Sequence, residues 1–154
     1  MRRERPPSGL LHPLALAAIA LLLVNDHVLK ARYPGWLTGK LSDVAGLVFF
    51  PLLLRALLAP LLGPLLGVAG PGRRWERLLI ACAALTALGF AAIKLWAPAT
   101  AACEQILGAL RGGAQVRIVR DPTDLLALPS VLAALWIGRR APLRGAPAPR
   151  YRAA

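Results

Sequence analysis

Apolar residues fall into four long segments of the chain, and shorter polar or charged stretches separate them. The segments run from Leu10 to Leu29, from Ser42 to Val68, from Leu78 to Trp96 and from Asp121 to Ile137. Each is close to the roughly 20 residues that a helix needs to cross the hydrocarbon core of a bilayer. Leucine and alanine dominate them, which favours helices in lipid over strands rich in β-branched and aromatic residues. The pattern therefore predicts an all-α polytopic membrane bundle with four transmembrane helices.

Turn residues and prolines predict where the second helix begins and how it runs. Pro34-Gly35 marks a turn after the first helix, so we expect the second helix to begin near Ser42 or Asp43. Arg55 lies in the middle of this helix and is expected to face the interior of the bundle. Three prolines within the helix predict a bend: Pro51, Pro60 and Pro64.

The connection between the third and fourth helices is the longest, from Ala97 to Arg120. It predicts a short outer-face helix around Ala101 to Leu110, which the Gly112-Gly113 pair ends. Residues 1–138 then form one four-helix transmembrane domain. Residues 139–154 are rich in Arg, Pro, Ala and Gly and have too little apolar surface to fold alone, so we expect a disordered, basic cytoplasmic tail.

Composition supports insertion in a membrane and adds an orientation. Hydrophobic residues make up 57% of the chain, and its mean hydropathy is +0.58, which is high for a soluble protein. The net charge of +12 comes from arginines clustered between apolar segments, a pattern typical of membrane topology signals. We therefore expect membrane lipids as partners, and no nucleic acid. In the four-span topology eleven Lys and Arg residues lie on the side of the termini and seven on the other side, which predicts cytoplasmic termini. The bias toward Ala, Arg, Gly, Pro and Leu indicates a GC-rich bacterial genome, and hence the inner membrane.

A polar band from Asn25 to Asp43 lies between the first two apolar segments, on the side opposite the termini. The four-span topology brings the start of the fourth helix and most of the acidic residues to the same level. Ionisable residues at the edge of the hydrocarbon are costly unless they pair or face a wet cavity, so they are functional candidates. The candidate acid/base or catalytic residues are Asp26, His27, Asp43 and Asp124, and the candidate substrate-binding residues are Lys30, Lys40, Arg120 and Asp121.

Local structure explains part of this pattern without any function. Asp26 and Lys30 have the spacing of an ordinary helical ion pair. The Asp121-Pro-Thr-Asp124 sequence has the form of a helix cap. For His27 taken alone, an interfacial hydrogen bond is a better explanation than a role as a ligand or base. Capping, however, does not require a histidine and all three lysines of the chain on one side, and we therefore expect a functional pocket there.

Three chemistries fit such a pocket. Lysines and Arg120 suit the anionic headgroup of an envelope lipid, acids with His27 suit a divalent metal, and Asp26 or His27 suits a proton relay. The chain holds no H-E-x-x-H helix, P-loop, nucleophile elbow or tandem C-x-x-C, so the sequence identifies no cofactor, metal or reaction. One alternative is a non-enzymatic scaffold subunit that contacts a partner protein or a second copy. A small proton-coupled transporter ranks third because the two halves of the chain share no internal repeat.

A set of polar positions resembles the VanZ-like family of small bacterial membrane proteins. The positions are Lys40 with Asp43, Glu104-Gln105, Arg120 and Asp124. The resemblance covers the chain from Lys40 onward and implies a four- or five-helix bundle at the cell envelope, linked in some members to glycopeptide resistance. The family's histidine after the second-helix acid and its asparagine after the last acid are replaced here, since VAGLVFF follows Asp43 and LLALP follows Asp124. The resemblance therefore implies the architecture and no shared activity.

Overall fold

The structure is a computed structural model that describes residues 9–33, 35–66 and 72–140. Within these ranges the chain is helical and holds no β-strand, which confirms the predicted all-α class. In chain order the elements are α1 (Pro13–Val24), the π-helix η1 (Asn25–Leu29), α2 (Lys30–Arg32), α3 (Trp36–Leu66), α4 (Arg73–Leu95), α5 (Ala97–Leu110), the 3₁₀-helix η2 (Pro122–Ser130) and α6 (Val131–Arg140).

The first predicted helix is one continuous rod made of α1, η1 and α2. Pro13 occupies its first turn, where a missing N–H is tolerated, and His12 Nδ1 accepts a hydrogen bond from the Leu14 N–H at 3.3 Å. Near the end of the rod the helix widens, because the Lys30 N–H donates to the Asn25 carbonyl five residues earlier. Such π-turns are rare and often occur at functional sites.

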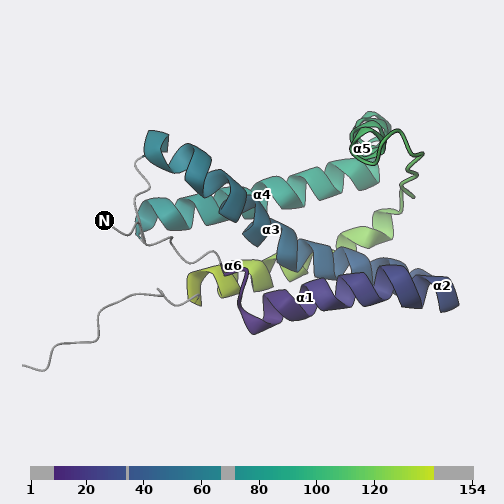
Figure 1. The fold of residues 1–154 in the computed structure, drawn as a ribbon, viewed down its shortest axis with the longest axis horizontal. Coiled ribbons are helices and arrows are strands. Elements are labelled where there is room, and N and C mark those ends of the chain that lie inside the picture. The colour runs from purple at the N-terminus through teal and green to yellow at the C-terminus, as the bar shows by residue number, and fades with distance from the viewer. Residues whose placement is uncertain (1–8, 34, 67–71, 141–154) are drawn as a thin grey trace, which may run out of the picture.

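The second helix, α3, begins at Trp36, so the prediction of a start near Ser42 is wrong. The turn is complete at Gly35, whose N–H donates to the Thr38 hydroxyl at 3.2 Å and so ties the turn to the first residues of the helix. Lys40 therefore projects from α3 and not from a loop. The three prolines of α3 do not end the helix, and Figure 1 shows it changing direction along its length, as expected for a helix that contains proline.

The third helix, α4, begins at Arg73, five residues before the predicted segment that starts at Leu78. The outer-face helix, α5, begins earlier than predicted, at Ala97, and ends at Leu110 as predicted. In Figure 1 α5 is seen nearly end-on beyond the last turn of α4, so it runs across the end of α4. Gly112 and Gly113 have φ angles of 70° and 88°, which confirms the predicted break.

The fourth predicted helix departs most from expectation. Its first half, Pro122–Ser130, is the 3₁₀-helix η2, and only Val131–Arg140 is α-helical. Pro129 explains the break because it has no N–H for an α-helical hydrogen bond. A single α-helix ending at Ile137 is therefore wrong, and so is a disordered tail that starts at residue 139, because α6 continues to Arg140. The remainder of that tail, residues 141–154, and the basic residues 1–8 lie outside the described residues.

α3 is the central element, since it packs against α1, α4, η2 and α6. Two of the clusters of buried residues lie between these helices. One cluster consists of Leu52 with Ala15, Leu79, Ala134 and Ile137, and the other of Leu47 with Ala83, Ala127 and Val131. Alanines alternate with the larger side chains, and small residues of this kind allow close approach of helices in membranes.

Three helical stretches of the described chain are long and apolar enough to cross a membrane: Pro13–Arg32, Trp36–Leu65 and Arg73–Leu95. Large apolar side chains are exposed along them, among them Leu61 and Leu85. An apolar surface of this extent is unusual for a soluble monomer and ordinary for a protein in lipid. The fold is thus compatible with a multi-pass membrane protein.

The helices carry different side chains at their two ends. At the arginine end, the first turn of α4 meets the last turn of α6, and Arg139 pairs with Glu76 at 2.9 Å. Arg55 lies toward this end and is wholly buried, as predicted; it donates to the Gly138 carbonyl at 3.3 Å and lies 4.8 Å from the Trp75 ring. At the polar end, the first turns of α3 contact η1, the end of α4 and the start of η2.

Candidate functional site

At the polar end, one buried carboxylate joins three elements. Asp124, on the first turn of η2, accepts a hydrogen bond from the Lys40 ammonium at 2.7 Å and another from the Lys94 ammonium at 2.6 Å. Lys40 belongs to α3 and Lys94 to the last turn of α4, and none of the three side chains is more than 12% exposed. Oδ1 accepts from Lys40 and Oδ2 accepts from Lys94. Charge-assisted hydrogen bonds of this length are strong in buried surroundings, so this trio fixes α3, α4 and η2 to one another.

Two further acids lie beside these lysines. Asp43 is 3.6 Å from Lys94, which is longer than a hydrogen bond, and Asp121 is 4.0 Å from Lys40. Asp121 also caps η2, since it accepts hydrogen bonds from the backbone N–H and the hydroxyl of Thr123 at 2.8 and 2.7 Å, which confirms the predicted cap. These two hydrogen bonds hold the pKa of Asp121 below its ordinary value.

A second hydrogen-bond network joins the first helix to α3. The side-chain amide of Asn25 is wholly buried and donates to the Thr38 carbonyl at 2.6 Å and to the Ser42 hydroxyl at 2.7 Å. The Ser42 hydroxyl donates to Asp26 Oδ1 at 2.7 Å, and the Lys30 ammonium donates to the same oxygen at 2.7 Å. The predicted helical pair of Asp26 with Lys30 is confirmed, and Asp26 also reaches α3. The network starts from residues of the π-helix η1.

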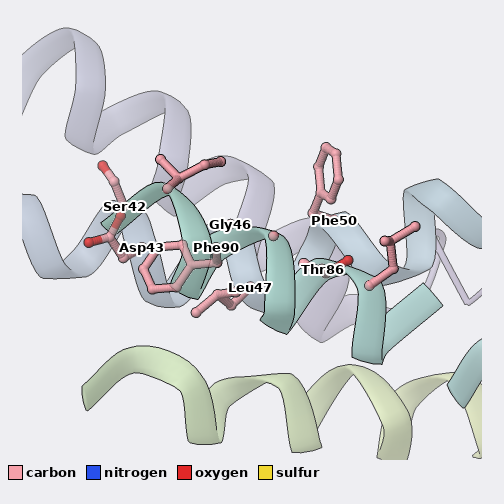
Figure 2. A pocket seen from close by; sticks show the side chains of 10 residues that line it. Ser42, Asp43, Gly46, Leu47, Phe50, Thr86 and Phe90 are labelled. Atoms are coloured by element: carbon pink, nitrogen blue, oxygen red, sulfur yellow. The ribbon is translucent and has the colours of Figure 1, made fainter. Parts of the chain in front are cut away.

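An open groove of about 290 Å³ between α3 and α4 ends at these polar residues. Figure 2 shows Asp43 beside Ser42 and Phe90 at one end of the groove, with Phe50 toward the other end. Lys94 reaches the same charged end, 5.5 Å from the Phe90 ring. The groove is therefore apolar along most of its length and charged at one end. The remaining lining residues are Gly46, Leu47, Leu85, Thr86, Gly89 and Ile93.

Most of the candidate residues predicted from the sequence lie in these two networks. His27 and Arg120 do not: both are exposed, and neither side chain makes a hydrogen bond or an ion pair with a described residue. Another acid assigned to this side of the chain, Glu104, accepts a hydrogen bond from the Ile118 N–H at 2.6 Å and so holds the segment before η2. The structure brings together Asp26, Lys30, Lys40, Asp43, Asp121 and Asp124.

Three residues that complete the networks were expected on this side of the chain but were assigned no catalytic or binding role. Lys94 ends an apolar segment and resembles an ordinary interfacial anchor, although its place among the three lysines on one side of an arginine-rich chain was a usable signal. Ser42 resembles the start of a helix, but it bridges Asn25 and Asp26. The burial of Asn25 depends on its contact with α3, which the local sequence does not reveal.

The described residues hold no group of three His, Cys, Asp or Glu side chains placed to ligate a metal ion. At the polar end the carboxylates face lysine ammonium groups, which repel a cation. The geometry therefore gives no support to the metal hypothesis.

Comparison with protein-family models, with curated proteins and with solved structures finds no match to this chain. The resemblance to the VanZ-like family thus stays a prediction, and the functional assignment depends on the geometry of the chain itself.

Proposed function

We propose that the chain is an integral protein of the bacterial inner membrane that crosses the bilayer four times. Its fourth crossing consists of η2 followed by α6. With about 2.0 Å per residue in a 3₁₀-helix and about 1.5 Å in an α-helix, these elements span roughly 33 Å, against a hydrocarbon core of about 30 Å. Leu126, Leu132 and Trp136 are exposed along them, as side chains that face lipid would be.

The distribution of arginines supports cytoplasmic termini and an extracytoplasmic polar end. Arg73, Arg74, Arg139 and Arg140 all lie at the arginine end, in the first turn of α4 and the last turn of α6. Clusters of positive residues next to membrane helices favour the cytoplasmic side.

For the polar end we propose that it binds the phosphate-bearing headgroup of an envelope lipid. The observation that supports this function is the position of Lys94. It donates to the buried carboxylate of Asp124, and it also lies 3.6 Å from Asp43 and 5.5 Å from the Phe90 ring, two residues that line the groove. A lysine ammonium has three donors. Lys94 donates one to Asp124 and faces Asp43 at 3.6 Å, so it retains capacity for a phosphate oxygen.

Thermal unfolding of the purified protein in detergent tests this function. A phospholipid at about 100 times its Kd is expected to add roughly 2.7 kcal/mol of stability, or about 5–10 °C in Tm for a chain of this size. Diacylglycerol with the same chains is expected to give no such shift. Lys94→Met should abolish the shift, whereas Lys94→Arg, which keeps the charge, and Arg139→Met, at the arginine end, should retain it. Equal shifts from phospholipid and diacylglycerol would contradict headgroup binding.

A second candidate is a scaffold subunit without a ligand at this end. It is favoured by the mutual compensation of the charges, because each lysine of the polar end has a carboxylate oxygen within 2.7 Å. On this interpretation the ion pairs only pin the helices, and the exposed face around α5 contacts a partner protein. The scaffold is expected to show no lipid-dependent shift in Tm that Lys94→Met removes.

A further inference from the structure

The groove between α3 and α4 is open at its two glycines. A Cβ atom built at Gly46 or at Gly89 would meet no other atom within 4 Å. Two side chains of the groove, Phe50 on α3 and Leu85 on α4, are 50% and 58% exposed. Both helices are long and apolar enough to cross a membrane, so the groove opens to the surface that faces lipid. A hydrocarbon chain can therefore enter it sideways from the bilayer.

The size of the groove suits part of one hydrocarbon chain. From Asp43 to Phe50 it follows two turns of α3, roughly 10 Å. Its volume of about 290 Å³ lies near the lower end of the range for ligand sites and is too small for both chains of a diacyl lipid.

Asp43, at the charged end of the groove, uses less of its hydrogen-bonding capacity than the other acids there. Within the described residues no N–H or O–H donates to its carboxylate, and its ion pair with Lys94 is 3.6 Å long. The other aspartates each accept two hydrogen bonds: Asp26, Asp121 and Asp124. An ionised carboxylate accepts several hydrogen bonds, so Asp43 presents acceptor sites to a ligand in the groove.

The two charged groups at the end of the groove select the kind of headgroup. The Asp43 carboxylate and the Lys94 ammonium lie 3.6 Å apart, so a ligand there meets one negative and one positive group. A headgroup with negative charge alone would set that charge against Asp43. A headgroup with both a phosphate and an ammonium group matches both members of the Asp43–Lys94 pair.

We propose that this site binds an aminophospholipid, whose ammonium donates to Asp43, whose phosphate accepts from Lys94, and one of whose acyl chains lies in the groove. This inference rests on the proposed binding of a lipid phosphate and specifies the class of lipid. It narrows the sequence-based expectation of an anionic lipid headgroup, because the structure adds the carboxylate of Asp43 at the end of the groove.

Native mass spectrometry of the full chain, purified in detergent and mixed with single lipids, tests the headgroup. The probes are dioleoyl phosphatidylethanolamine and dioleoyl phosphatidylglycerol, which have identical chains, and a polyprenyl phosphate. Phosphatidylethanolamine is expected to be retained about tenfold better than phosphatidylglycerol, the effect of one charge-assisted hydrogen bond. Asp43→Asn is expected to remove that preference.

A pair of glycine variants tests the groove. Gly89→Leu fills the groove and is expected to lower retention of phosphatidylethanolamine by about tenfold or more, since several buried CH₂ groups are displaced. Gly39→Leu is the matched control: a Cβ there also meets no atom within 4 Å, but Gly39 does not line the groove, so retention should not change. Thermal unfolding of each variant reports whether it is folded.

The other outcomes separate the two proposals. Equal or better retention of phosphatidylglycerol would overturn the aminophospholipid and leave lipid-phosphate binding intact, whereas retention of neither phospholipid would overturn both. The acyl-chain assignment would be overturned by a preference for the polyprenyl phosphate. Unchanged retention of phosphatidylethanolamine by folded Gly89→Leu would also overturn the acyl-chain assignment, because the lipid would then bind outside the groove. A dimer whose interface covers the groove would overturn it as well.

Discussion

Asp124→Asn removes the charge that joins α3, α4 and η2 while it preserves the shape of the side chain. In the wild-type protein the carboxylate accepts from Lys40 at 2.7 Å and from Lys94 at 2.6 Å, and its side chain is 12% exposed. The asparagine oxygen can accept from one lysine, and its amide N–H groups then face the other. Lys94 keeps Asp43 at 3.6 Å, and Lys40 keeps Asp121 at 4.0 Å.

The expected loss of stability follows from this geometry. Removal of one partner from a fully buried ion pair costs about 3–5 kcal/mol. Because two other carboxylates remain near the lysines, we expect a smaller loss of about 2–3 kcal/mol in the free energy of unfolding. For a chain of this size, this corresponds to a fall in Tm of roughly 5–10 °C.

Thermal unfolding in detergent, followed by tryptophan fluorescence, measures this loss. The control is Glu76→Gln, which breaks the ion pair with Arg139 at the arginine end, where both side chains are about half exposed. Exposed pairs contribute about 0–1 kcal/mol, so Tm should change by no more than about 4 °C. A loss for Asp124→Asn no larger than that for Glu76→Gln would refute the view that the buried trio holds the polar end together.

Three further predictions concern other parts of the structure. Gly138→Ala is expected to lower the free energy of unfolding by about 1–3 kcal/mol, because the new Cβ would lie 2.6 Å from a methyl group of Leu79 in α4. Gly89→Ala, where the Cβ meets no atom within 4 Å, should be neutral or stabilising. Equal effects of the two substitutions on thermal unfolding would contradict the close packing at Gly138. Hydrogen bonds from Thr123 lower the pKa of Asp121, so the charged cap stabilises the fold above the ordinary carboxyl pKa of about 3.9, and this contribution is lost as the pH falls through the lowered value. Asp121→Asn should therefore flatten the dependence of Tm on pH below about pH 4, and an unchanged profile would count against the cap. Arg55→Ala is expected to cost about 2–4 kcal/mol in thermal unfolding, since it leaves a cavity between α3, α4 and α6, and wild-type stability in this variant would argue against its packing role.

The sequence predicted the helical class and four apolar spans, and three helices of the described chain are long and apolar enough to cross a membrane. These features were predictable because lipid imposes simple requirements of length and polarity. It missed the start of α3, since the Thr38–Gly35 contact that ties the turn to the helix is too local for hydropathy to reveal. It also missed the 3₁₀ winding of η2. The predicted fourth helix ran from Asp121 to Ile137 through Pro129, whereas α-helical hydrogen bonding begins only after this proline, at Val131.

The sequence predicted the end of the helices at which the candidate site lies, but not which side chains pair with one another there. Topology alone brings the ends of the helices together, and so it placed Asp43 and Asp124 at one end of the protein. The ion-pair partners depend on how each helix is rotated about its own axis. Asp124 pairs with Lys40 and Lys94, which lie 84 and 30 positions away along the chain. His27 and Arg120 were selected by residue type and sequence position, and the structure leaves both side chains exposed.

The central claim is that the polar end faces outward and the arginine end faces the cytoplasm. Single-cysteine labelling in bacterial spheroplasts, with a maleimide that does not cross membranes, tests it most directly in a background of Cys82→Ala and Cys103→Ala. The exposed positions are His27→Cys and Arg120→Cys at the polar end and Arg139→Cys at the arginine end. We predict that the first two are labelled in intact spheroplasts and that Arg139→Cys is labelled only after lysis. Labelling of Arg139→Cys in intact spheroplasts, or of only one of the other two, would contradict the account.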